Sequence, residues 1–202
     1  MPAAPPHSDE ILAVVVVGDG PYDLAPICGV PAVVRAVRTL LGVAGEVAVL
    51  APDSVRDEAL RLCAGLPLRR PDLVGAEIGG AEIVVLHEAV RPLAPSALAD
   101  AVLAAVRAGA HAAVPVLPLT DTVKRVGEGG LLHAAPDRAT LRVVQSPVAF
   151  RPAGRLPAGA LDLVARCAAV GTPVHTVPGD PAALPVRTPW DLEVAGLLEA
   201  GG

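Results

Sequence analysis

The sequence is poor in aromatic residues and in lysine. Its 202 residues include one tyrosine, one phenylalanine and one tryptophan, and Lys124 is the only lysine. The formal net charge is -5 and no basic run occurs, so the chain offers neither an electrostatic stripe nor a stacking surface for bases. These absences argue against a nucleic-acid partner.

Long apolar runs and metal-type cysteine spacings are also missing. The 52% of residues that are hydrophobic occur in short runs, and none reaches the roughly 18 apolar residues that a membrane span needs. Residues 1–10 lack the basic start and apolar core of a signal peptide, so we expect a disordered leader and a cytoplasmic protein without membrane contact. Cys28, Cys63 and Cys167 are far apart and odd in number, which disfavours disulfides and a zinc site. We expect them to be small core residues.

Five β-type runs alternate with helical patterns along residues 11–202. The β-type runs are residues 11–17, 46–51, 82–89, 112–119 and 174–179. Helices are predicted to begin at Pro31, after a cap at Asp53, at Ser96 and after a cap at Thr188. This alternation predicts one α/β domain with a mostly parallel sheet and helices on both faces. Ligands bind beyond the carboxyl ends of such strands, which points to the segments after Val17, around Glu88 and after Leu119.

Residues 123–144 interrupt the alternation. The stretch TVKRVGEGGLLHAA predicts a β-hairpin with Gly129 and Gly130 at its tip. A hairpin that projects from a compact α/β domain is more often a dimerisation arm than part of the core. The segment is therefore a candidate dimerisation arm.

Charged and hydroxyl side chains follow two of the predicted strands. In HEAVRP, Glu88 offers a carboxylate for Mg²⁺ and Arg91 a guanidinium for a phosphate, or else the two form a local ion pair. In TDTVKR, Thr122 offers a hydroxyl and Lys124 a mobile charge for a phosphate, or else the segment is a solvated strand edge.

The turn after the first strand, GDGPYDLAPICG, has the strand, glycine and helix layout that binds nucleotide phosphates. Gly18 and Gly20 are its candidate nucleotide-loop residues. The turn contains no lysine or arginine, and Asp19 and Asp23 carry the wrong sign for a triphosphate. We expect it to shape a pocket without supplying the cations that a triphosphate needs.

Four segments in order carry a family resemblance: VVLHEAVRP, PVLPLTDTVKRV, PDRATLRVVQSPVAFR and VRTPWDLEVA. Together they resemble the 2-C-methyl-D-erythritol 4-phosphate cytidylyltransferases of non-mevalonate isoprenoid synthesis, whose signatures are HDAxRP, PVxDTxKR, DRxxLWxxQTPQxF and KxTxPEDL. The resemblance implies a Rossmann-like nucleotidyltransferase fold with a protruding hairpin arm, a homodimer and Mg²⁺. It also implies that CTP and methylerythritol phosphate react to CDP-methylerythritol and pyrophosphate.

The resemblance assigns roles to single residues as well. Glu88 stands where the family has a metal-binding aspartate, and Arg138 matches an arm arginine that reaches the partner subunit's substrate. Arg187 lies two residues beyond the family's terminal lysine position, which here is Pro185, and in a strand it would project to the same face. The implied roles are metal binding by Glu88, substrate binding by Arg91, Thr122 and Arg138, and catalysis by Lys124 and Arg187.

Two segments depart from the family pattern. The family's first loop carries an arginine and a Pro-Lys pair that bind CTP phosphates, and this chain has neither there. A GGxxRxxS segment is replaced by LRRPDLVGAEIGG, where Arg69 and Arg70 are the residues that could compensate. Three interpretations stay open: a cytidylyltransferase with weak or lost activity, an inactive homologue that binds a regulatory partner, and a cytidylyltransferase for another alditol phosphate.

Overall fold

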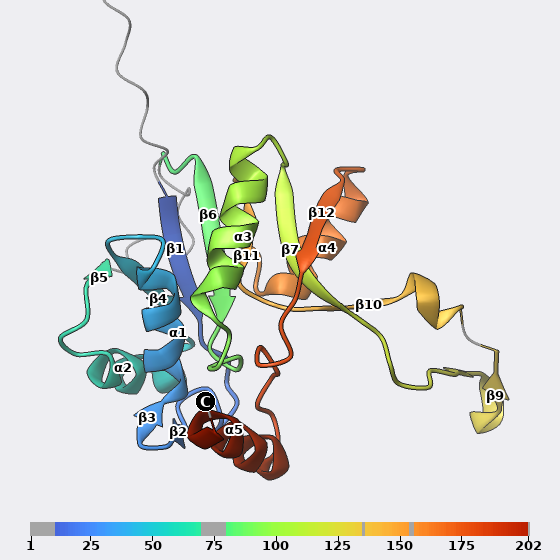
Figure 1. The fold of residues 1–202 in the computed structure, drawn as a ribbon, viewed down its shortest axis with the longest axis horizontal. Coiled ribbons are helices and arrows are strands. Elements are labelled where there is room, and N and C mark those ends of the chain that lie inside the picture. The colour runs from blue at the N-terminus through green and yellow to red at the C-terminus, as the bar shows by residue number, and fades with distance from the viewer. Residues whose placement is uncertain (1–10, 70–79, 135, 154–155, 202) are drawn as a thin grey trace, which may run out of the picture.

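The computed structural model describes residues 11–69, 80–134, 136–153 and 156–201. The expected leader and Arg70 lie outside the described residues. The main sheet has the strand order β10-β7-β11-β6-β1-β4-β5, with β12 paired to β7 (Figure 1). The five predicted strands all form: β1 (Ile11–Val16), β4 (Val47–Leu50), β6 (Ile83–Glu88), β7 (Ala112–Pro118) and β12 (Val174–Pro178).

Most pairings in this sheet are parallel, as predicted. β1 runs parallel to β4 and β6, β12 runs parallel to β7, and the short β5 (Leu68–Arg69) runs parallel to β4. Two strands that the sequence analysis missed are antiparallel: β11 (Val148–Phe150) lies between β6 and β7, and β10 (Arg142–Val144) pairs with β7. The carboxyl ends of β1 and β6 meet at one edge, where Val16 pairs with Glu88.

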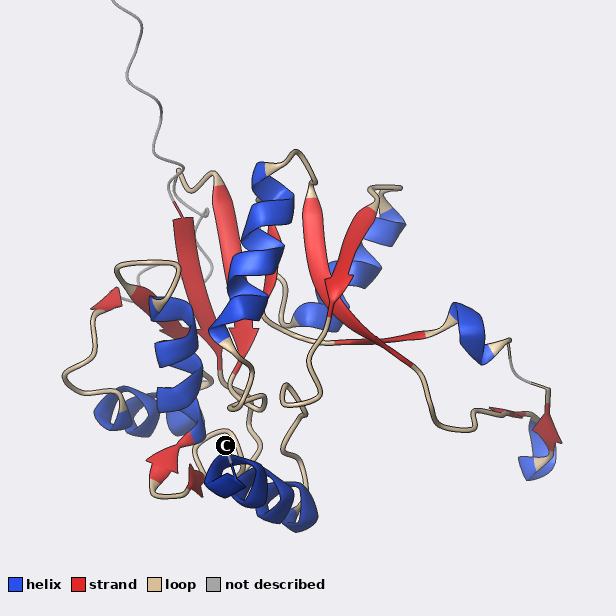
Figure 2. Ribbon diagram, in the orientation of Figure 1, coloured by secondary structure: helices blue, strands red, loops and turns tan. Residues whose placement is uncertain are grey.

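Helices cover both faces of the sheet (Figure 2), which confirms the predicted α/β architecture. The apolar run of β1 explains why, because its alternate side chains point to opposite faces and both sets are buried. Ala13 and Val15 pack under α1 (Ala32–Leu41), α2 (Asp53–Leu62) and α3 (Ser96–Arg107). Leu12 and Val14 pack in the core under α4 (Ala160–Ala169), a helix that the sequence analysis missed.

The carboxyl-terminal helix α5 (Pro189–Gly201) lies beside the small hairpin of β2 (Pro26–Ile27) and β3 (Val30–Pro31). Its predicted cap is present: the Asp191 N–H donates to Thr188 Oγ1 (3.1 Å), and the Thr188 N–H donates to Asp191 Oδ2 (2.9 Å). Among the described helices, none combines the length and apolarity that crossing a bilayer requires.

Two smaller predictions were wrong. Asp53 is not a cap but the first residue of α2, where its carboxylate pairs with Arg56 one turn later. Cys63 and Cys167 are buried as expected, but Cys28 is exposed in the turn between β2 and β3. Its φ of +48° shows that the turn geometry, rather than core packing, determines its position.

The predicted hairpin arm projects sideways from the body (Figure 1). It consists of β8 (Arg125–Val126) and β9 (Leu132–His133), joined by a 3-10 turn over Glu128–Gly130. Gly129 and Gly130 have φ angles of +67° and +77°, which explains the two glycines at the tip. After a second 3-10 turn (Arg138–Thr140) the chain enters β10, so residues 142–144 belong to the main sheet and not to the arm.

Candidate functional site

The loop after β1 folds back on its own carboxylate. The Gly18 N–H donates to Asp23 Oδ1 at 2.7 Å, and a Cβ on Gly20 would lie 3.1 Å from Asp23 Oδ2. Burial raises the pKa of the Asp23 carboxyl above its usual value, and the negative charge of Glu88 acts in the same direction. The hydrogen bond from Gly18 and the positive charge of Arg187 lower the pKa, but they offset only part of the rise. A backbone amide of the kind that would bind a phosphate is therefore occupied by an aspartate.

Glu88 and Arg91 lie at the end of β6 and form the local ion pair considered above. Arg91 Nε donates to Glu88 Oε2 at 3.3 Å. The same buried guanidinium donates to the carbonyl oxygens of Ala183 (2.6 Å) and Val144 (3.1 Å). Burial lowers the pKa of Arg91, although the Glu88 charge acts in the opposite direction. Arg91 thus connects β6, β10 and the segment that precedes α5, and its substrate-binding role remains a prediction.

The other carboxylate oxygen of Glu88 faces the start of α4. A Cβ on Gly159, the residue just before that helix, would lie 2.9 Å from Glu88 Oε1, so a larger residue there would displace the Glu88 carboxylate. A carboxylate near a helix amino terminus is stabilised by the helix dipole. Among the described residues, no group of three His, Cys, Asp or Glu side chains assembles into a metal site. Glu88 and nearby Asp23 still fit Mg²⁺, which usually takes only one or two protein carboxylates and completes its shell with phosphates and water.

A buried polar network behind Glu88 was missed by the sequence analysis. Ser146 Oγ accepts the Glu88 N–H (3.1 Å) and lies 3.0 Å from His87 Nδ1. Burial, and to a lesser extent the positive charge of Arg91, lower the pKa of His87 to about 3, so the imidazole is neutral at physiological pH. The network fixes the backbone at the residue that carries the candidate metal carboxylate.

Gln145, next to Ser146, holds the segment that leads to Arg187. Its amide accepts the Asp180 N–H (2.9 Å) and donates to the Asp180 carbonyl oxygen (2.8 Å). The close approach requires Gly179, because a Cβ there would clash with Gln145 Oε1 and lie 2.9 Å from the Val116 carbonyl oxygen. The QSP segment resembled a family motif, but only the structure shows that its glutamine anchors the segment at Asp180 and its serine anchors the end of β6.

Arg187 lies at the exposed rim of this cluster. Its charge lowers the pKa of Asp23 and also that of Arg91, which places its guanidinium near both groups. The segment around Pro185 is not a strand, so the argument from alternating strand side chains was wrong. Arg69 lies near Ile11, the first residue of β1, and thus at the amino end of the sheet, away from the loop it was considered to compensate.

The remaining candidate residues gather on the arm instead. Thr122, Lys124 and Arg138 line one hollow of about 270 Å³, and Arg138 Nη1 donates to the Thr120 carbonyl oxygen (3.3 Å). The structure therefore forms two separate groups within one chain. Glu88, Arg91 and Arg187 lie near the carboxyl ends of the central strands β1 and β6. Thr122, Lys124 and Arg138 lie on the arm that projects from the body (Figure 1).

Comparison with known proteins identifies the family. The family model described as IspD, 2-C-methyl-D-erythritol 4-phosphate cytidylyltransferase, matches residues 72–199. The chain belongs to the IspD family. A cytidylyltransferase of that name from Nocardia farcinica is 36% identical over 201 residues, which cover 88% of this chain and 85% of the relative. Its counterpart from Saccharopolyspora erythraea is 35% identical over 202 residues, with 87% and 89% covered.

A solved structure agrees with this assignment. The 2-C-methyl-D-erythritol 4-phosphate cytidylyltransferase of Thermus thermophilus matches with a TM-score of 0.70 at 25% identity, covering 94% of this chain and 98% of that one. The IspD nucleotidyltransferase fold expected from the four sequence motifs is thereby confirmed. Because the match extends over almost the whole of both chains, the fold likeness includes the strands that carry the candidate site.

Proposed function

We propose that this chain is a cytoplasmic, homodimeric member of the IspD family in which cytidylyl transfer from CTP to methylerythritol phosphate is weak or absent. The observation that carries the proposal is the loop after β1, where Asp23 takes the Gly18 amide and no lysine or arginine occurs from Gly18 to Gly29. A buried carboxylate in this position repels a triphosphate instead of attracting it.

The reaction depends on the cations that are missing from this loop. In the family reaction, a phosphate oxygen of methylerythritol phosphate attacks the α-phosphorus of CTP, the bond to the β-phosphate breaks, and pyrophosphate leaves. Catalysis then rests on positioning and charge neutralisation, and losing one preorganised donor typically lowers the rate about 10²-fold or more. Losing both loop cations leaves little turnover, unless Lys124 and Arg187 take over their role.

The sugar-phosphate half of the site is better preserved. Arg91, Thr122, Lys124 and Arg138 keep the residue types expected for a phosphate, and Glu88 would hold Mg²⁺ together with substrate phosphates. When bound, the metal would neutralise charge on those phosphates. An inactive homologue would therefore still bind a sugar-alcohol phosphate, and that binding would serve a regulatory or partner-binding role.

We expect calorimetric titration with CTP and Mg²⁺ to give no binding in the micromolar range, and pyrophosphate release in the presence of methylerythritol phosphate to be at least about 10²-fold slower than in an active relative. Methylerythritol phosphate alone should still bind. The matched variant is Asp23→Asn, which removes the negative charge and should strengthen CTP binding. Rapid pyrophosphate release by the wild type would contradict the proposal, while turnover only with another alditol phosphate would indicate a different substrate.

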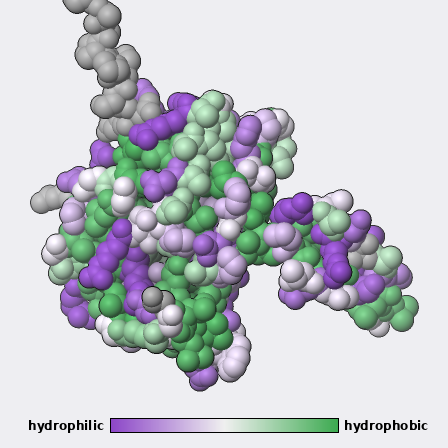
Figure 3. All heavy atoms as spheres, in the orientation of Figure 1, coloured by the Kyte–Doolittle hydropathy of each residue, from purple (hydrophilic) through white to green (hydrophobic). Residues whose placement is uncertain are grey.

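The arm supports the homodimer. Leu131 and Leu132 are 66% and 70% exposed at its tip, and Figure 3 shows hydrophobic surface there. Large apolar side chains grouped on an exposed hairpin are typical of an interface. In a dimer, each arm would bring its Lys124 and Arg138 toward the other protomer, which would join the two groups of candidate residues.

The predicted interface at the arm can be tested by placing negative charges on its apolar tip. The double variant Leu131→Asp/Leu132→Asp should weaken dimerisation at least about tenfold, because two carboxylates would have to be buried. The control is Leu197→Asp on α5, where the leucine is similarly exposed at 73% but lies outside the arm. Sedimentation equilibrium measures the dimer dissociation constant of the wild type, the double variant and the control. A wild-type monomer, or dissociation caused by Leu197→Asp alone, would show that the arm is not the interface.

A further inference from the structure

A cavity of about 330 Å³ lies at the end of the sheet opposite the candidate active site. His111 directly precedes β7, Thr172 precedes β12, and Phe150 ends the antiparallel β11 where it lies beside Ala112. All three therefore lie at the amino ends of the parallel strands, whereas Glu88 lies at the carboxyl end of β6. A molecule bound in the cavity would not compete with substrates for the same space.

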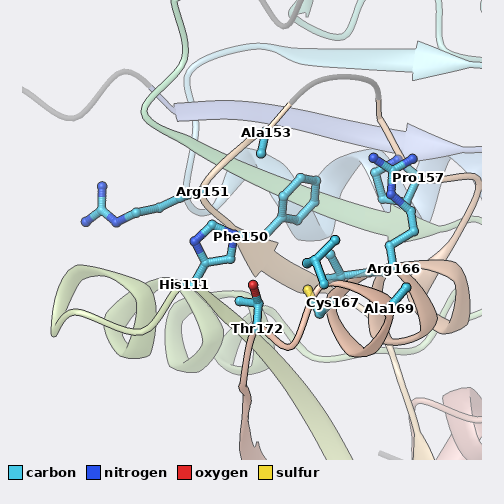
Figure 4. A pocket seen from close by; sticks show the side chains of 11 residues that line it. His111, Phe150, Arg151, Ala153, Pro157, Arg166, Cys167, Ala169 and Thr172 are labelled. Atoms are coloured by element: carbon cyan, nitrogen blue, oxygen red, sulfur yellow. The ribbon is translucent and has the colours of Figure 1, made fainter.

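The cavity has an apolar floor and a polar rim (Figure 4). Phe150, Leu163 and Cys167 form the floor, and all three are buried in the core between the sheet and α4. The rim includes His111 from the sheet side and Arg166 from α4. The volume is at the lower end of the roughly 300–1,000 Å³ found for small-molecule sites.

The charge of the rim indicates the kind of ligand. The chain carries a net charge of -5, yet the described residues that line this cavity include two arginines, one histidine and no carboxylate. Arg151 extends away from the cavity in Figure 4 and donates to the Val106 carbonyl oxygen at 3.4 Å, so it contributes mainly its stem.

Arg166 is the cation available to a ligand. Within the part of the chain that the structure describes, its guanidinium has no hydrogen-bond or ion-pair partner, and Arg166 and Pro157 both line the cavity (Figure 4). A cation in the last turn of a helix also stabilises the helix dipole, so Arg166 alone would not indicate a site. An amphiphilic anion needs a cation for its charged group and an apolar surface for its hydrocarbon. Arg166 supplies the first contact and the cavity floor the second, and no carboxylate among the described lining residues opposes the anion.

We propose that this cavity is a second ligand site, which takes a small anion with a hydrocarbon body. The hydrocarbon lies on Phe150, Leu163 and Cys167, and the carboxylate or phosphate lies against Arg166. The proposal does not depend on cytidylyl transfer, because the site shares no residue with the candidate active site.

Hexyl phosphate is the probe. Hexanol is the control that has the hydrocarbon chain without the anion, and inorganic phosphate is the control that has the anion without the chain. Titration calorimetry should detect hexyl phosphate below about 1 mM, while each control binds at least about tenfold more weakly. Carrying out the titration with hexanoate as well distinguishes a phosphate preference from a carboxylate preference. No binding of either anion, or equal binding of hexanol, would overturn the proposal.

The variant Arg166→Gln should weaken hexyl phosphate binding about tenfold, since it removes a charge-assisted contact. Arg61→Gln is the matched control, because Arg61 also lies in the last turn of an exposed helix but far from the cavity in the fold. Thermal unfolding of both variants checks that they are folded. If the two variants weaken binding equally, or neither does, the anion is not held by Arg166 and the site is not the one proposed.

Discussion

Replacing Arg91 by alanine is expected to lower the free energy of unfolding by about 3 kcal/mol or more, because a buried ion pair that loses one partner leaves the other charge uncompensated. The Glu88 carboxylate would remain largely buried, and the carbonyl oxygens of Val144 and Ala183 would lose their donor. Urea denaturation followed by circular dichroism measures the change. The result matters for function, since a guanidinium that holds three segments together has fewer donors left for a phosphate.

The control for this prediction is Arg61→Ala. Arg61 pairs with Glu58 at the same spacing of three residues, but both side chains are more than half exposed, at 69% and 58%. Its removal should cost less than about 1 kcal/mol, the usual limit for surface ion pairs. If Arg91→Ala costs no more than Arg61→Ala, then Arg91 is not a structural connection, and the substrate-binding role proposed for it would account for it better.

The strands that could be predicted are those with long apolar runs. β1 and β6 are covered on both faces, so nearly every side chain is apolar and the signal is strong. β10 and β11 have three residues each, too few for a pattern, and their antiparallel pairing depends on where the arm returns the chain. α4 was missed because RPAGRLPAG before it resembles a loop, and its buried face consists of only Ala160, Leu163 and Cys167.

The candidate site was predictable in its residue types but not in its grouping. Glu88 and Arg91 were found because they directly follow a buried strand, and the same rule led to Thr122 and Lys124. The predicted arm over residues 123–144 already placed Lys124 outside the body of the domain, but the sequence could not show that Thr122 joins it there, away from Glu88 and Arg91. Nor could it show that Asp23 turns back onto Gly18, because that contact depends on how a short loop closes.

Lowering the pH from 7 to 5 is expected to reduce the free energy of unfolding through His87. The His87 pKa is about 3 in the folded protein, below the usual 6.5, because of burial and the neighbouring Arg91. Between these two values the unfolded chain binds a proton that the folded chain does not. The contribution of His87 is therefore complete above pH 6.5 and is lost as the pH falls toward 3, at about 1.4 kcal/mol per pH unit. From pH 7 to 5 the loss is about 2 kcal/mol.

The variant His87→Asn isolates this effect, because its amide keeps a polar group near Ser146 but does not titrate. Other groups affect the total slope; the raised pKa of Asp23, for example, acts in the opposite direction as the pH falls. The informative quantity is thus the difference in unfolding free energy between wild type and variant, measured by urea denaturation without divalent cations. That difference should shrink as the pH falls from 7 to 5. A constant difference would mean that water or a rearrangement stabilises the charged imidazole, and that His87 is not held neutral behind Glu88.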